Sequence, residues 1–468
     1  MKNFLFFSFL ITTQSISAGI QDSLARYYKC SALLLERYPK SNDKKVKLIK
    51  EEKLSGTEAC EDLYQGLHFN KEGLLTPATS RSLKVFSSFQ KFYNSWIKLK
   101  NLNFETQDFS NTDYYDINEG PYHLTYSLFS KEHFGEIFKG NTFYKAKRKS
   151  SSDKRYFFDR DIHGFRFEVD TPFNKWKIGS EDSDEYGQQG PNRFFDRPQL
   201  AEVGQLIGIR KINSYTNKIF YRDTDISFYP NKPKGAGVIG TNPYLIANSS
   251  SLNRKVMGLF DYDRRWATSV FRDYLCLELP LLSENDVLKY IDKESNTSFL
   301  TDSKCMQCHV TMDFMGATLR NIERYNTGDD DGNFSIVASY THSVEERKRF
   351  KEELPTHYAK LFKTSPDGIL YFRDIKGNLI REKVENLEQL GQKISQTDAP
   401  YYCAVKRHFE YFTNYNVPMN AFFQYYQNNT KDPLIRYLVK LSEELKEKGN
   451  LKKMITQIIA SPYFLEKK

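Results

Sequence analysis

The chain has 468 residues, of which 39% are hydrophobic and 15% aromatic, and its formal net charge is +9. This length allows roughly two to four domains with cores of their own, which excludes a small electron-carrier module and a largely disordered protein. Basic and acidic residues are interspersed, and no basic stripe accompanies a nucleic-acid-binding motif, so we expect no nucleic-acid partner.

Residues 1–18 have the layout of a secretory signal peptide. Lys2 precedes an apolar run from Phe4 to Ile11, and small and polar residues follow as far as Ala18. The apolar run is too short to cross a bilayer, and no later stretch has the length or purity of a transmembrane helix. We therefore expect an exported protein, periplasmic or secreted, without a transmembrane segment.

Apolar spacing predicts a helical N-terminal domain at residues 19–103, in which Ser55 and Glu58 form the capping-box pattern of a helix start. Residues 104–234 change to short aromatic and β-branched runs that are broken by Gly, Pro, Asn and Asp. This change favours a mixed, β-containing region. The strand patterns in this region are at residues 204–212 and 218–230.

Helical patterns return at residues 235–345, which hold the most informative motif of the chain. Residues 346–468 are expected to form a helical C-terminal domain, with a hairpin whose turn centres on Gly377. Near its end, Asp432 and Pro433 predict a helix start and Gly449 a helix stop. The predicted fold class is mainly α with a mixed α+β insert, in several domains.

The motif is CMQCH, from Cys305 to His309. Covalent haem attachment needs two thiols that add to the vinyl groups of the porphyrin and a histidine beside the second thiol that binds iron. Cys305 and Cys308 would form the thioethers, and His309 would be the proximal ligand of one haem c. The predicted cofactor-binding residues are therefore Cys305, Cys308 and His309, and His309 is the predicted metal ligand.

Three other readings of the motif stay open. A structural zinc site needs four Cys or His ligands, usually in two spaced pairs, and the sequence holds no second pair of this kind. A redox dithiol usually stands near the start of a compact βαβ fold, which the surrounding sequence does not resemble. A plain disulfide is the third reading.

The sequence does not identify the sixth iron ligand. Met312 and Met315 follow His309 so closely that they are expected to stay on its side of the haem. The candidates, besides no ligand at all, are Met312, Met315, His342, His357, His408 and Met419.

The other four cysteines allow three disulfide pairings. Disulfides persist in the oxidising compartment that the signal peptide predicts. We favour Cys30 with Cys60, which is a local closure, and Cys276 with Cys403, which ties distant regions together.

The segment CMQCHVTMDFMGATLRN at residues 305–321 resembles the haem-attachment segment of the large planctomycete-type cytochrome c-like proteins. The family pattern is C-x-x-C-H, then Met-Asp, and then a small-residue, helical stretch. Phe314 stands where that family commonly has a proline. Further segments are similar to the family in the same order: residues 235–250 with 264–280, residues 398–416, and residues 458–468. The resemblance implies an exported haem protein and names no substrate.

We therefore expect an exported c-type cytochrome-like protein that transfers electrons to a redox partner protein, or performs haem-based redox chemistry. An oxidoreductase activity would require five-coordinate iron, and the sequence assigns no catalytic acid or base. The alternative is an exported binding or structural protein in which CMQCH is a disulfide or an accessory metal site.

Overall fold

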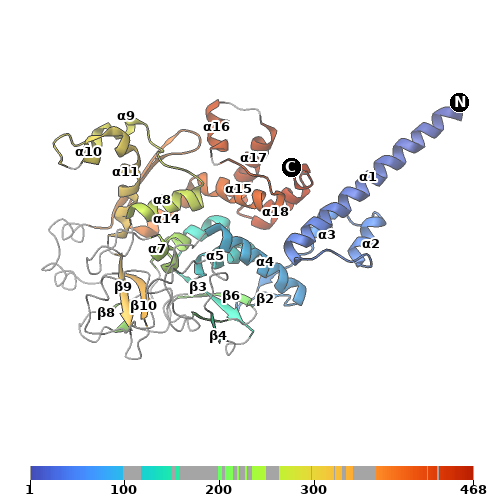
Figure 1. The fold of residues 1–468 in the computed structure, drawn as a ribbon, viewed down its shortest axis with the longest axis horizontal. Coiled ribbons are helices and arrows are strands. Elements are labelled where there is room, and N and C mark those ends of the chain that lie inside the picture. Colours follow the sequence, from blue (N-terminus) through green and yellow to red (C-terminus); the bar gives the residue numbers. More distant parts are fainter. Residues whose placement is uncertain are drawn as a thin grey trace.

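A computed structural model describes the larger part of the chain. The described residues are 2–97, 118–149, 154–157, 199–202, 206–213, 219–220, 227–228, 234–248, 263–296, 298–320, 322–328, 334–340, 365–418, 420–428 and 432–466. The fold is mainly helical, with small antiparallel sheets of two strands each (Figure 1). This agrees with the predicted mainly α class.

The N-terminal region is helical, as predicted. Its helices are α1 (Lys2–Leu35), α2 (Lys44–Lys50), α3 (Gly56–Glu61) and α4 (Ser80–Ile97). Ser55 and Glu58 form the predicted capping box at the start of α3. The first part of α1 extends away from the rest of the molecule (Figure 1), whereas its last turns hold Cys30 and Leu34 in the core. The signal peptide at residues 1–18 stays a prediction.

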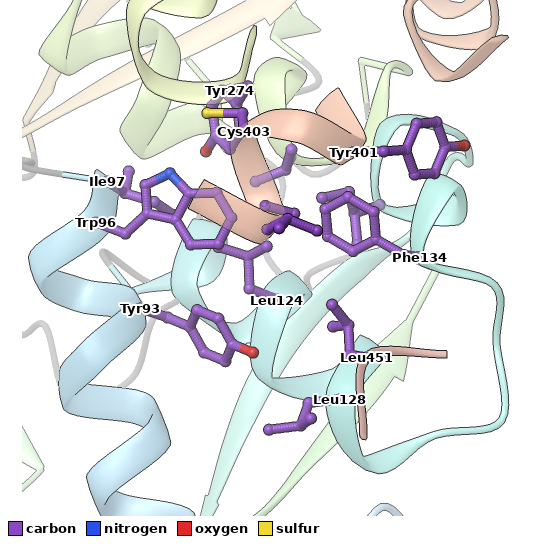
Figure 2. Close-up of a cluster of buried hydrophobic side chains, with 14 of the residues drawn as sticks. Tyr93, Trp96, Ile97, Leu124, Leu128, Phe134, Tyr274, Tyr401, Cys403 and Leu451 are labelled. Carbon is purple, nitrogen blue, oxygen red and sulfur yellow. The ribbon is translucent and has the colours of Figure 1, made fainter. Parts of the chain in front are cut away.

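The largest core is rich in aromatic side chains and draws on all four predicted regions. Helix α5 (Glu119–Phe129) packs against α4 and against the 3-10 turn η1 (Phe134–Phe138), and aromatic rings of helix α15 (Ala399–Thr413) contact those of α4. Figure 2 shows side chains from these elements meeting in one cluster. The indole of Trp96 donates a hydrogen bond of 2.7 Å to the Asp273 carbonyl, which links α4 to the central region.

Short strand pairs lie around this core. They are β1 (His68–Phe69) with β2 (Leu75–Thr76), β3 (Phe143–Arg148) with β6 (Leu206–Ile212), β4 (Lys154–Phe157) with β5 (Gln199–Glu202), and β7 (Ile219–Phe220) with β8 (Ser227–Phe228). The predicted strand at residues 204–212 is β6, and the pattern at 218–230 contains the two short strands β7 and β8. Strands β9 (Ile322–Gly328) and β10 (Phe334–Tyr340) also pair, although the sequence patterns do not predict them.

The central region is built from short helical elements. These are η4 (Gly237–Gly240), α7 (Asn242–Ala247), α8 (Asp263–Val270), the π-helical turn η5 (Phe271–Leu275), α9 (Glu284–Val287), η6 (Leu288–Tyr290), α10 (Ser298–Thr301), α11 (Ser303–Gly316) and η7 (Ala317–Leu319). Helix α8 continues into η5, and the helical path ends at Cys276, whose φ of 50° is left-handed. A disulfide joins Cys276 to Cys403 on α15.

The C-terminal region opens with the predicted hairpin, in which β11 (Gly368–Arg373) pairs with β12 (Leu379–Val384). Gly377 has a φ of 84°, a conformation that glycine adopts without steric cost. Helices α14 (Leu387–Gln396), α15, α16 (Ala421–Asn428), α17 (Pro433–Lys448) and α18 (Leu451–Ala460) and the turn η8 (Pro462–Phe464) follow. The Asp432 side chain caps α17, and Gly449 ends it with a φ of 64°, as predicted.

Both favoured disulfides are present, Cys30 with Cys60 and Cys276 with Cys403. Their sequence separations are 30 and 127 residues. In the chain-entropy model a cross-link stabilises the fold more when it closes a longer loop. The second bridge is therefore expected to contribute more to stability than the first.

We expect the double substitution of Cys276 and Cys403 by Ala to lower the free energy of unfolding by about 5 kcal/mol, and that of Cys30 and Cys60 by about 3.5 kcal/mol. Denaturant unfolding of the oxidised proteins, compared with wild type, measures both values. A larger loss for the Cys30 and Cys60 pair would contradict the loop-length argument.

Candidate functional site

Helix α11 carries the CMQCH motif and is fixed by its neighbours. The Asp302 side chain caps it by accepting a hydrogen bond of 2.8 Å from the Lys304 backbone amide. The helix packs against α8, α9, α10 and β11. Met306 and Val310 are buried in a small cluster with Leu282, Val287 and Tyr371. These contacts hold the backbone of the motif in one orientation.

The three predicted site residues lie together on this helix. Cys305 is three residues before Cys308 and four before His309, and such spacings place side chains next to each other on a helix surface. Cys305 is exposed, Cys308 and His309 are half-buried, and both cysteines are free thiols. The four remaining cysteines of the chain are paired in disulfides.

Burial changes the protonation of two of these groups. It raises the pKa of the Cys308 thiol, and the neighbouring Cys305 raises that pKa further. It also lowers the pKa of His309, as does the positive charge of Arg264, while Asp313 opposes this shift. His309 is therefore neutral near pH 7, which is the form that binds metals.

Four side chains from three helices, His309 among them, form a closed ring of contacts. The imidazole stacks on the Phe299 ring, with centroids 4.3 Å apart and planes 14° apart. The Arg264 guanidinium lies 4.7 Å from the centroid of Phe299 and binds the Asp313 carboxylate, with 2.9 Å from Nη2 to Oδ2. Asp313 Oδ2 in turn lies 3.8 Å from His309 Nδ1. The ring fixes the plane of the imidazole.

Three of the possible sixth ligands lie within the described residues. Met315 is buried in the largest core, and Met312 packs against that core from the same helix. The Met312 sulfur lies 3.1 Å from the Thr268 hydroxyl. Both methionines therefore belong to the packing of α11. His342, His357 and Met419 lie outside the described residues.

His408 is held in the aromatic core on α15. Its Nδ1 lies 2.7 Å from the Ala404 carbonyl and its Nε2 lies 3.0 Å from the Tyr93 hydroxyl. Both nitrogens are thus hydrogen-bonded, with Nδ1 donating to the carbonyl and Nε2 accepting from the hydroxyl. Burial lowers the pKa of His408 to about 4, so that it is neutral. Its hydrogen bonds leave no nitrogen for iron.

No protein-family model, curated protein or solved structure matches the chain. Across the described ranges, no group of three or more His, Cys, Asp or Glu side chains is placed to hold a metal ion. The helices searched in the same ranges include none that is long and apolar enough to cross a membrane.

The ring of contacts that includes His309 is not predictable from the sequence. Asp313 stands four residues after His309, a spacing that places the two side chains on one helix face. Arg264 and Phe299 come from other helices, and no local pattern predicts that they meet. The only sequence signal was the Met-Asp pair that follows the motif.

A second ion pair lies between two elements that pack against α11. Arg373 of β11 donates two hydrogen bonds to the Asp286 carboxylate of α9, one of 2.8 Å from Nε and one of 2.7 Å from Nη2. This bonding, with that from Ser283, holds the pKa of Asp286 at about 2. The pair joins α9 to β11, and α11 packs against both.

We expect Asp286→Asn to lower the free energy of unfolding at neutral pH by about 2 kcal/mol. The depressed pKa of the carboxyl stabilises the fold above its ordinary pKa, near 4, and this contribution is lost as the pH falls towards 2. The variant should therefore lose less stability than wild type over that window. Urea unfolding at several pH values measures this, with Glu284→Gln, an exposed carboxyl on the same helix, as control. Parallel pH profiles of wild type and Asp286→Asn would contradict the assignment.

Proposed function

We propose that this protein is an exported c-type cytochrome-like protein that carries one covalent haem on α11 and transfers single electrons. The observation that carries the proposal is the pair of free thiols beside His309, in a chain whose other four cysteines form disulfides. Two neighbouring thiols do not persist unpaired in an oxidising compartment without a reason. Consumption of both thiols by haem attachment supplies that reason.

The residues of α11 fit such a group. In attachment, each S–H bond adds across a vinyl double bond, so that sulfur bonds to one carbon and hydrogen to the other and no atom is released. Cys305 and Cys308 are free to react in this way, and His309 is neutral. The bound iron would supply one-electron chemistry between its ferric and ferrous states.

The other readings of the motif have less support. Reactive dithiols depend on a lowered thiol pKa, whereas burial raises that of Cys308. A structural zinc site needs four Cys or His ligands, and the described residues include no group of three or more His, Cys, Asp or Glu side chains placed to hold a metal ion. Haem attachment needs only the three residues that α11 brings together.

Three of the segments that resemble the planctomycete-type cytochrome family, residues 264–280, 305–321 and 398–416, are linked to one another. Arg264 begins one of them and binds Asp313 in the haem-attachment segment. The disulfide from Cys276 to Cys403 joins that same segment to residues 398–416. This mutual contact supports the proposal that the segments form one haem-binding unit. The two disulfides and the signal-peptide pattern favour a periplasmic or secreted location.

A haem stain of the denatured protein, with a pyridine-haemochrome spectrum, tests the proposal after expression of the full chain in a bacterium with cytochrome c maturation machinery. We expect one covalent haem per chain. Cys308→Ser should reduce covalent haem several-fold because one thioether is lost. Gln307→Ala, which changes a position between the two cysteines of the motif, is the matched control and should stain like wild type.

Absence of covalent haem from wild type, in a host that loads a known cytochrome, would refute the proposal. The motif would then be read as a dithiol or accessory metal site in an exported binding or structural protein. Full staining of Cys308→Ser would instead contradict the thioether assigned to Cys308. A redox titration of the loaded protein would next establish whether the iron cycles at a potential accessible to a partner protein.

A further inference from the structure

The proton position on His309 determines which of its nitrogens can bind iron. A neutral imidazole carries one proton, and the nitrogen without it offers the lone pair. His309 Nδ1 is buried and has no hydrogen-bond partner among the described residues. The acidic group facing it is the Asp313 carboxylate, whose Oδ2 lies 3.8 Å away. A carboxylate is an acceptor only, so its presence favours a proton on Nδ1.

We propose that Asp313 is a positioning residue that keeps the proton of neutral His309 on Nδ1 and so presents Nε2 to iron. This inference rests on the proposed haem site. A histidine that binds a metal commonly donates its second N–H to a carboxylate, which fixes the ring and makes the ligand a stronger donor. Asp313 is placed for that role one helical turn after His309.

The carboxylate cannot turn freely, because Arg264 holds both of its oxygens. Nε of Arg264 bonds to Oδ1, and Nη2 bonds to Oδ2 at 2.9 Å. Oδ2 therefore faces both Arg264 and His309. Since the arginine comes from α8, the position of the acid depends on how α8 packs against α11. The same packing places Arg264 over Phe299.

Phe299 restricts the remaining freedom of the imidazole. The two rings are nearly parallel at 4.3 Å, so one face of His309 is covered. The histidine side chain is 22% exposed, which leaves it only partly accessible to solvent. With one face covered by Phe299 and Nδ1 turned towards Asp313, the opposite edge of the ring, with Nε2, is left for the iron.

Nitrogen NMR of the full chain, prepared without haem, tests this contact directly. At about pH 8 a histidine side chain is neutral, and the nitrogen-15 shifts of its ring report which nitrogen carries the proton. The His309 signals are identified by their loss in His309→Gln. We expect the Nδ1–H form to exceed the Nε2–H form by about tenfold in wild type. Asp313→Leu should lower this ratio at least several-fold, and Asp313→Asn, which keeps an acceptor, should lower it less.

Glu284→Gln is the matched charge control, because it removes an exposed carboxyl from α9, which packs on α11. It should leave the His309 ratio unchanged. An unchanged ratio in both Asp313 variants would overturn the positioning role, whether or not the protein binds haem. If Asp313→Leu does not fold, as judged by circular dichroism, Asp313→Asn alone decides the result.

The loaded protein provides a second readout. Asp313→Asn is expected to weaken the preference for ferric over ferrous iron about tenfold, which raises the midpoint potential by about 59 mV. Glu284→Gln should leave the potential near that of wild type. A normal Nδ1–H preference in a chain that fails the haem stain would support the contact while refuting the proposed haem site. An unaltered ratio in a chain that does bind haem would refute the contact alone.

Discussion

The disulfide between Cys276 and Cys403 holds together the elements on which the candidate site depends. Cys276 directly follows the continuous helical segment formed by α8 and η5, and the disulfide joins the end of that segment to α15 in the largest core. The carbonyl of Asp273, three residues earlier, accepts the Trp96 indole N–H from α4. Residues 273–276 are thus attached both to α4 in the N-terminal region and to α15 in the C-terminal region. Because α8 begins only ten residues before Asp273, its first turn has little freedom to move relative to the core.

That first turn carries Arg264, which links α8 to the motif helix through Asp313. Helix α11 rests on two clusters, the largest core through Met315 and the small cluster through Met306 and Val310. These apolar contacts set the position of the helix, but they do not orient the polar side chains of His309 and Asp313. The bidentate ion pair with Asp313 does so, because a guanidinium and a carboxylate bond in one plane. Apolar packing therefore positions α11, and the ion pair with Arg264 orients its Asp313 side chain.

Local chemistry determined which features could be predicted from the sequence. The cap at Ser55, the turn at Gly377 and the stop at Gly449 each depend on neighbours a few residues away, and each is present. The motif itself was found for the same reason, since an i, i+3, i+4 spacing on a helix is local. The stacking of Phe299 on His309 was not predictable, because it joins two helices through tertiary packing. Strands β9 and β10 were missed as well, and the sixth ligand stays open because three candidates lie outside the described residues.

The motif lies outside the main hydrophobic core, which bears on whether the chain could fold before the proposed haem is attached. Neither thiol nor His309 is among the side chains of the largest cluster, which runs from Cys30 to Phe464. Figure 1 shows α9, α10 and α11 at the end of the molecule opposite the projecting part of α1. A small haem protein needs its haem to complete the core, whereas a chain of this size buries enough apolar surface without it. Under the proposed function, folding and haem attachment would therefore be separable steps, because the exposed Cys305 and the half-buried Cys308 stay accessible after the core has formed. The contact between Asp313 and His309 is already present in the chain without haem, so the protein would orient its iron ligand in advance.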